Sequence, residues 1–195
     1  MDHADKSACA ELVQAWGFAR DQGRWDDLAA IFHPGGEIAV SWFRGPYTEF
    51  VAHCRRNYGS GILAKHLLWP ARVTVNGARA VSETNVAILV RQTIDGVATD
   101  LTSHGRFLDR LEKRSDWRMV ERATVYEKDR LDPVEPSAAF DKLMAGADAA
   151  KYPVPYRYMG YRVHAAGRTL AEPVHYDGRP ETEELKRRYA AWLNG

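Results

Sequence analysis

The hydrophobic spacing changes along the chain from a helical repeat to an alternating one, and this change limits the possible folds more than any other feature. Before about residue 60, apolar residues recur every three to four positions, as Leu12, Trp16 and Ala19 do. Later, apolar and polar residues alternate, and the turn pairs Asn76-Gly77 and Asp95-Gly96 separate the alternating runs. Helices followed by hairpin-linked strands indicate an α+β fold with an antiparallel sheet.

The same spacing predicts the individual elements. Helices are expected over 6–22 and 25–32 and from Pro46 to about residue 58, with a half-buried strand at 37–42. Further strands are expected near 65–69, 72–75, 79–92, 98–111 and 117–128. Because long strands twist, we expect the sheet to curl into a cone around the N-terminal helices. A pocket would then form between the helices and the concave face.

The proline-rich segment 132–136 divides the chain into an α+β barrel domain over 1–132 and an extension over 133–195. The extension carries helical patterns near 137–144, before Gly167, and over 181–193. It is too small to form a core of its own. We therefore expect a helical C-terminal extension that packs on the barrel, over the pocket mouth or across a subunit interface.

The composition and the absence of certain motifs exclude several functional classes. A formal net charge of +1 gives no basic surface for nucleic acid. Cys9 and Cys54 form no Cys-x-x-Cys pair, which argues against a zinc ribbon or a thioredoxin-type site. The N-terminal segment is polar, and the longest apolar runs, such as 86–90, are too short to cross a membrane. We expect a cytoplasmic protein that binds neither nucleic acid nor membrane.

Three titratable residues on otherwise apolar segments are the candidates for chemistry. The sequence has no phosphate-binding loop, nucleophile elbow, metalloprotease helix or calcium loop. Asp21 ends the first helix, while His66 and His104 lie in predicted strands. Taken singly, each is more often structural, since an Asp near a helix end is usually solvated and a strand His is usually a satisfied core residue. Zinc-ligand spacings are missing, so no metal is expected.

Four short motifs follow one another along the chain. They are Asp21-Gln22-Gly23-Arg24-Trp25, Lys65-His66-Leu67, Ser103-His104-Gly105 and Asp116-Trp117-Arg118-Met119-Val120. Their order resembles the SnoaL-like families, which include scytalone dehydratase and share the cone-shaped, cystatin-like fold of nuclear transport factor 2. The first and last motifs are similar to the opening motif and the closing strand motif of those families, and the two between them to a Gln-His-Phe segment and a later Gly-His-Ala segment. The resemblance covers residues 12–132.

The resemblance implies a proton-transfer site. Asp21 would orient His66 through one ring nitrogen and leave the other nitrogen to act as general base. His104 would donate to a leaving hydroxyl or hold a substrate oxygen. No cofactor is implied, and relatives of this kind are often homodimers or homotrimers.

The sequence also departs from the family pattern. Residues 40–42 stand where scytalone dehydratase has a substrate-holding Tyr, so stacking by Trp42 is expected in its place and scytalone is not the expected substrate. The segments 156–161 and 191–193 resemble the C-termini of bacterial members. Some of those act on aromatic compounds, including lyases that release formaldehyde from lignin-derived diaryl substrates.

Three functional hypotheses remain open. The first is a cofactor-independent lyase or dehydratase that acts on a hydrophobic, hydroxylated, aromatic small molecule. The second is an isomerase or cyclase of the ketosteroid isomerase or SnoaL type, and the third is a non-catalytic binding module, in which Asp21 and His66 would not touch. The candidate substrate-binding residues are Trp42, Tyr58, Trp69, Asn85, Arg122 and Tyr126.

Overall fold

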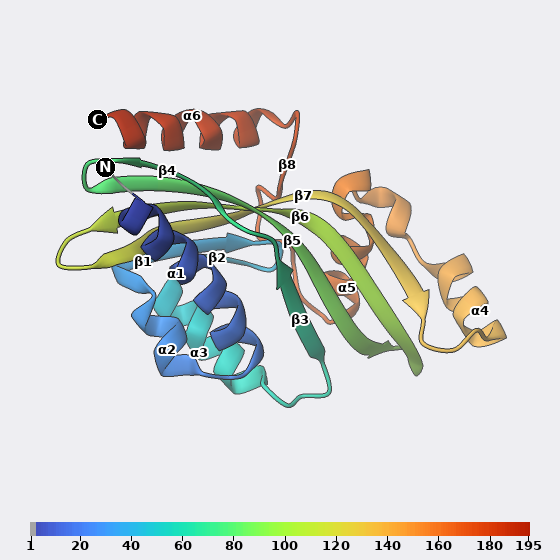
Figure 1. The fold of residues 1–195 in the computed structure, drawn as a ribbon. Helices are drawn as coiled ribbons and strands as arrows, with labels where there is room; N and C mark the ends of the chain where they lie inside the picture. Colours follow the sequence, from blue (N-terminus) through green and yellow to red (C-terminus); the bar gives the residue numbers. More distant parts are fainter. Residues whose placement is uncertain (1–2) are drawn as a thin grey trace.

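One curled sheet organises the computed structural model, which describes residues 3–195 (Figure 1). The helices α1 (His3–Asp21), α2 (Trp25–Ala30) and α3 (Tyr47–Asn57) lie together on the concave side of the sheet. The interior contains Trp16 from α1 and Phe50 from α3, which pack with Phe107 of the sheet. The helices therefore bury their apolar faces inside the curl.

The sheet contains eight strands in the described part of the chain, and three long ones form its centre. β5 (Arg79–Ile94), β6 (Val97–Lys113) and β7 (Trp117–Pro133) form an antiparallel meander. The strand order is β2-β1-β7-β6-β5-β3, with β4 beside β5 and β8 beside β7. The shorter strands are β1 (Phe32–Val40), β2 (Phe43–Pro46), β3 (Leu63–Leu68), β4 (Arg72–Asn76) and β8 (His175–Tyr176).

The expected α+β class and curled sheet are confirmed, and the tight turns lie where the sequence predicts them. Gly77, Asp95 and Gly96 all have positive φ, as hairpin turns of this kind require. The pairing differs in one respect, because β1 pairs with β7 in parallel and so does β8. The sheet remains open, so the expected barrel is a cone that does not close.

One predicted helix is too long. The second helix ends at Ala30, and Phe32 already pairs with Met119 of β7. Pro34 cannot donate a backbone hydrogen bond, and Gly35 adopts a φ of +82°, so the chain cannot continue as a helix here. The predicted strand at 37–42 consequently begins earlier, and Phe32 keeps its buried position.

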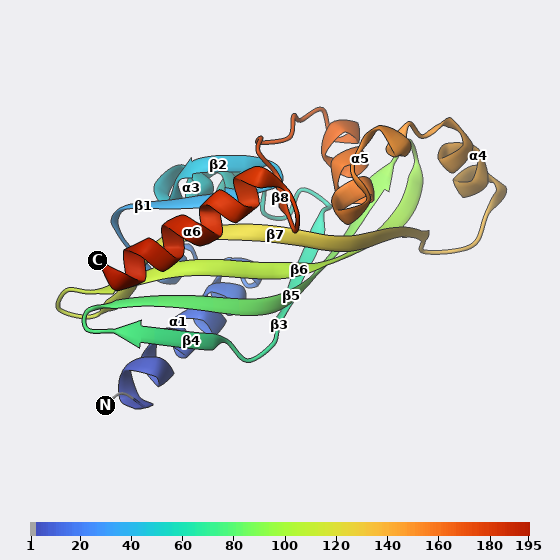
Figure 2. The ribbon, with the colours of Figure 1, turned by 90° about the horizontal axis from the view of Figure 1, so that it is seen from above.

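The C-terminal extension packs on the sheet in two places. α6 (Pro180–Asn194) lies on the side of the sheet opposite α1–α3, as Figures 1 and 2 show from two directions. Its Leu185 and Tyr189 cover Leu108 and Ala123 on the convex face. None of the helices within residues 3–195 has the length and apolar character needed to cross a membrane.

The other helices of the extension follow the end of β7. They are α4 (Ala138–Gly146) and α5 (Arg157–Ala165), joined by the short 3₁₀ segments Ala149–Lys151 and Val154–Tyr156. Ser137 caps α4 by accepting the Phe140 N–H at 3.3 Å. Asp129 of β7 accepts the Met159 N–H at 2.7 Å, which fixes the start of α5 against the sheet.

Candidate active site

A cavity of about 360 Å³ lies between the N-terminal helices and the concave face of the sheet. Helix α1 contributes Asp21, β3 contributes His66 and β7 contributes Tyr126, while Met159 of α5 extends the wall. The lining residues are Trp16, Arg20, Asp21, Val40, Ser41, Trp42, Phe50, His53, Cys54, Asn57, Tyr58, Gly59, Ser60, Ile62, Leu63, Ala64, His66, Ile88, Val90, Phe107, Thr124, Tyr126, Met159, Arg162 and Arg168.

Asp21 and His66 meet in this cavity, as their proposed roles require. The Nδ1–H of His66 donates to Asp21 Oδ1 at 2.6 Å, and the backbone N–H of His66 donates to Asp21 Oδ2 at 2.8 Å. The side chains are 4% exposed for Asp21 and 10% exposed for His66. One carboxylate therefore fixes both the position of the strand and the orientation of the ring. Because a carboxylate only accepts, the proton of the neutral ring lies on Nδ1 and Nε2 is left as an acceptor.

Burial and neighbouring charges set the protonation states of the pair. Burial lowers the pKa of His66, and this outweighs the opposing effect of the Asp21 carboxylate. Burial alone would raise the pKa of Asp21, but the hydrogen bonds and charge of His66, with Lys65 at 3.4 Å, lower it overall. At neutral pH the site therefore holds an ionised carboxylate and a neutral imidazole, which is the state a general base needs.

Aromatic rings form the wall of the cavity around this pair. The ring of Trp16 meets the imidazole of His66 edge-on, with centroids 5.3 Å apart. Phe50 stacks between Trp16 and Trp42, with centroid distances of 6.2 and 5.4 Å. Tyr58 contacts Trp25 and is half-exposed at the edge of the cavity. Such a wall favours a flat, hydrophobic ligand.

Three of the six predicted substrate-binding residues line the cavity, namely Trp42, Tyr58 and Tyr126. The oxygen of Tyr126 accepts the backbone N–H of Ser41 at 3.0 Å. Burial raises the pKa of Tyr126, so its phenol stays protonated. The phenol is thus a hydrogen-bonding group inside the cavity.

The structure places His104 away from this site. His104 lies opposite Ala87 of β5 and Lys128 of β7. The residues of β6 that face the interior, such as Leu101 and Phe107, are an odd number of positions away from it. Successive side chains of a strand point to opposite faces, so His104 lies on the convex side and does not line the cavity. The sequence motif located the strand correctly but not the face.

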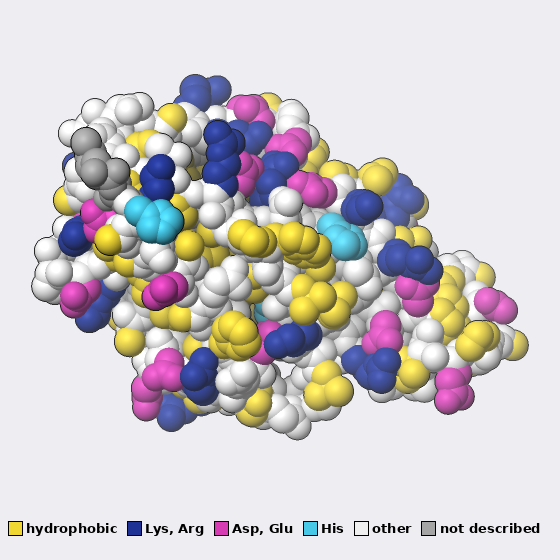
Figure 3. Space-filling view, in the orientation of Figure 1, with side chains coloured by type: hydrophobic (Ala, Val, Ile, Leu, Met, Phe, Trp, Pro, Cys, Tyr) yellow, Lys and Arg dark blue, Asp and Glu magenta, His cyan; other side chains and the backbone are white. Residues whose placement is uncertain are grey.

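Three predicted substrate-binding residues also lie elsewhere. Trp69 is 47% exposed in the link between β3 and β4, and Asn85, which it opposes, is exposed on β5. In Figure 3, hydrophobic side chains gather at the surface over β3 and α1. The exposed residues Leu63 and Leu67 belong to β3. Arg122 is fully buried behind the cavity, where Asp109 binds it through two hydrogen bonds of 2.7 and 2.8 Å. These three residues do not contact the cavity.

Three arginines of the cavity wall were not among the predicted site residues. Arg20 precedes Asp21 on α1, whereas Arg162 and Arg168 come from the C-terminal extension. A signal was present for Arg162, because it is the charged residue of the otherwise apolar stretch 159–163. Within residues 3–195, His, Cys, Asp and Glu side chains form no group of three with the geometry of a metal site.

The open cone of strands around three helices is an α+β fold of the kind found in nuclear transport factor 2-like proteins. The chain is similar to a nuclear transport factor 2-like protein with a cystatin-like fold from Novosphingobium aromaticivorans, with a TM-score of 0.50 and 23% identity over 72% of this chain and 88% of the other. A SnoaL-like domain model matches residues 2–123. The chain therefore belongs to the SnoaL-like family, and the expected resemblance is confirmed.

Individual proteins show the same relationship. A PEP2-like protein of Fusarium vanettenii is 30% identical over 200 residues, which is 95% of this chain and 84% of that protein. A hexachlorocyclohexane dehydrochlorinase (LinA type 2) has a TM-score of 0.56 with 14% identity, covering 69% of this chain and 93% of its own. A protein of N. aromaticivorans provisionally named scytalone dehydratase has a TM-score of 0.53 with 16% identity, covering 68% and 89%. The two structures share the fold with this chain.

Proposed function

We propose that this protein is a cofactor-independent lyase or dehydratase that acts on a hydrophobic, hydroxylated, aromatic small molecule. In this proposal His66 is the general base and Asp21 orients it. The observation that carries the proposal is the 2.6 Å hydrogen bond between His66 Nδ1 and Asp21 Oδ1 inside an aromatic cavity. A module that only binds ligands has no need for a buried, ionised carboxylate aligned on an imidazole, since such a charge is costly to bury.

The chemistry follows from the free ring nitrogen. His66 Nε2 removes a proton from a substrate carbon, and the electrons of that C–H bond form a C=C bond as the adjacent C–O bond breaks. Asp21 stabilises the imidazolium formed in this step. The imidazolium then returns its proton to the departing hydroxide, so that water leaves and the neutral base is regenerated. This cycle balances with one histidine and does not require His104.

Other polar groups in the cavity support a hydroxylated substrate. Ser41, Thr124 and Tyr126 are neighbouring lining residues, and the side chains of Ser41 and Thr124 interact with the Tyr126 phenol. Because this phenol keeps its proton, it would donate a hydrogen bond to an oxygen atom of the substrate. Family membership and fold neighbours named as a dehydrochlorinase and provisionally as a dehydratase agree with elimination chemistry.

Two compounds test the proposal. One is 3-hydroxy-1-tetralone, which is an aromatic β-hydroxy ketone, and the other is a diaryl compound that bears a hydroxymethyl group. Chromatography with mass spectrometry of the products identifies the reaction: loss of water indicates a dehydratase, release of formaldehyde a carbon–carbon lyase, and a new, separable product of unchanged mass an isomerase. Reactions run in D₂O also reveal proton removal from carbon through deuterium uptake. We expect one of these substrates to react and His66→Ala to lower kcat by at least about 10²-fold.

His104→Ala is the matched control, since it truncates a strand histidine that lies on the convex face, outside the cavity. We expect it to retain wild-type kcat. If the wild-type protein neither converts nor deuterates any of these compounds, or if His66→Ala is as active as the wild type, the proposed base is excluded.

A further inference from the structure

Arg162 is a buried cation without a carboxylate partner. Its side chain lines the cavity, the residue is only 9% exposed, and its Nε has no hydrogen-bond partner among the described residues. The contact of its guanidinium is a weak one, from one terminal nitrogen to the sulfur of Met159 at 3.8 Å. No Asp or Glu within residues 3–195 lies at salt-bridge distance from it. Buried charges in proteins are normally paired, so this one calls for an explanation.

The molecule contains a direct contrast to this arrangement. Arg122 is also fully buried, but its guanidinium makes two hydrogen bonds of 2.7 and 2.8 Å to Asp109. The charge of Arg122 is therefore paired, although its Nη1 makes no hydrogen bond to a described residue. Arg162 differs because it lines the cavity and has no carboxylate of the described residues beside it.

Two further arginines add positive charge to the same cavity. Arg168 lies over the ring of Trp42 at 5.5 Å, and Arg20 lines the wall on α1. Burial and the charge of Arg168 lower the pKa of Arg162 to about 10, so it is still a cation at neutral pH. Three guanidinium groups thus face one carboxylate, and that carboxylate, Asp21, is already bound to His66 and Lys65.

We propose that the cavity takes an aromatic carboxylate, whose anionic group is bound by Arg162 with support from Arg168 and Arg20. A guanidinium binds a carboxylate through strong charge-assisted hydrogen bonds, so the ligand would give Arg162 the anionic partner that the described residues do not supply. The stacked rings of Trp42 and Phe50 would hold the aromatic body. This inference rests on the proposed function, because it names the substrate class of the same cavity, but it concerns binding and is tested without turnover.

The test compares 2-naphthoate with 2-naphthamide, which has nearly the same shape but no charge. Isothermal titration calorimetry of the full chain gives a Kd for each. We expect the carboxylate to bind at least about ten-fold more tightly than the amide, which corresponds to about 1.4 kcal/mol. In Arg162→Met the ratio should fall toward one while binding of the amide persists, and Arg168→Gln should lower the ratio in part.

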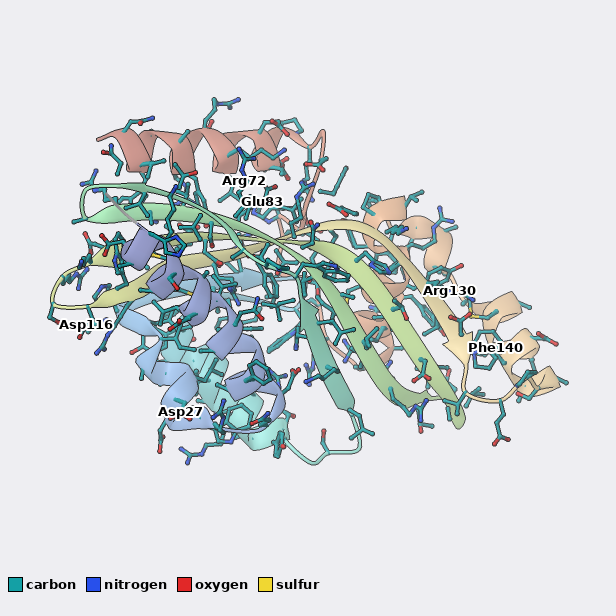
Figure 4. The ribbon with its side chains drawn as sticks, viewed as in Figure 1. Asp27, Arg72, Glu83, Asp116, Arg130 and Phe140 are labelled. Carbon is teal, nitrogen blue, oxygen red and sulfur yellow. The ribbon has the colours of Figure 1, made fainter. Side chains whose placement is uncertain are left out.

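Arg72→Met is the control for overall charge. Arg72 pairs with Glu83 in the register of β4 and β5, and both lie on the α6 side of the sheet, away from the cavity (Figure 4). This variant should keep the full preference for the carboxylate. Arg168 is only half-buried, so its variant remains informative if Arg162→Met fails to fold.

The outcomes separate this inference from the proposed function. The inference is overturned if the wild-type protein binds both probes equally, if it does not bind the naphthoate, or if the preference survives in both arginine variants. His66→Ala should keep the carboxylate preference, because it does not alter the arginines. A protein that prefers the carboxylate but shows no dependence of turnover on His66 would retain the binding site and lose the proposed base.

Discussion

At the scale of single residues, Asp21 performs two tasks that the sequence could only partly predict. Its Oδ1 accepts from the imidazole of His66, and its Oδ2 accepts from the backbone N–H of the same residue. The family motif indicated the first contact, since Asp and His recur there in this order. The second contact depends on where β3 crosses the end of α1, which only the folded chain shows. The carboxylate thus aligns the base by accepting hydrogen bonds from both its ring and its backbone.

The pH dependence of turnover should reflect this environment. A base must be neutral, so activity is lost as the pH falls through the pKa of His66. Burial lowers that pKa below its ordinary 6.5, whereas Asp21 stays ionised because its own pKa is lowered below 3.8. We expect the acidic limb of the kcat/KM profile to have its midpoint below pH 6.5. In Asp21→Asn the limb should move to still lower pH, because the interaction that raises the pKa of His66 is lost. A midpoint above pH 6.5 in the wild type would contradict the lowered pKa of His66.

Asp109 supplies a second prediction at this scale, for stability. Asp109→Ala should lower the free energy of unfolding by about 3–5 kcal/mol, because it leaves the guanidinium of Arg122 buried and unpaired. Urea denaturation measures the change. The control is Asp100→Ala, which breaks the solvent-exposed pair of Asp100 and Arg91 and should cost far less, because water and salt screen such a pair. Equal losses in the two variants would show that the buried pair is not structurally important.

At the scale of elements, the alternating pattern located the long strands well and the faces of individual residues less well. His104 and Asn85 both lie in strands that the pattern predicted, yet both point away from the cavity. The reason is that an alternating pattern assigns the residues of a strand to two opposite faces but does not show which face is concave. A bulge between β6 and β7 beside Gly105 and a bend between β3 and β4 add to the difficulty, and the bend leaves Trp69 outside.

Gly105 tests the packing of the two central strands. A Cβ at this position would overlap the carbonyl oxygen of Val125 on β7, which belongs to the backbone and cannot rotate away. Gly105→Ala should therefore destabilise the protein by about 1–3 kcal/mol, as overpacking generally does. Gly146→Ala is the matched control, since a Cβ there meets open space and should leave the unfolding midpoint nearly unchanged. Thermal denaturation of both variants decides the point, and an unaffected Gly105→Ala would refute the close approach.

At the scale of the whole molecule, the C-terminal extension packs against both faces of the curled sheet. α5 places Met159 and Arg162 in the cavity wall, while α6 covers the convex face with Leu185 and Tyr189. The sequence indicated that this segment would pack on the cone, because it is rich in aromatic residues. It could not indicate which residues reach the cavity, since that depends on docking across long distances in the chain. The expected homodimer or homotrimer stays a prediction.

Leu185 tests the coupling between the extension and the cone. It is 4% exposed and packs against the convex face, so Leu185→Ala should lower the free energy of unfolding by about 2–5 kcal/mol. Because α6 lies on the central strands, unfolding should remain a single transition at a lower urea concentration, whether it is followed by circular dichroism or by tryptophan fluorescence. Two separate transitions would mean that the extension folds independently of the cone.

The protonation state of His66 decides whether this residue can act as the base, and it is measured without any substrate. Nitrogen-15 NMR of the labelled protein distinguishes the two neutral tautomers and the imidazolium by the shifts of the ring nitrogens. At pH 7 we expect a neutral ring with its proton on Nδ1 and an unprotonated Nε2, and we expect Asp21→Asn to weaken this preference. An imidazolium at pH 7, or a proton on Nε2, would rule out His66 as the base.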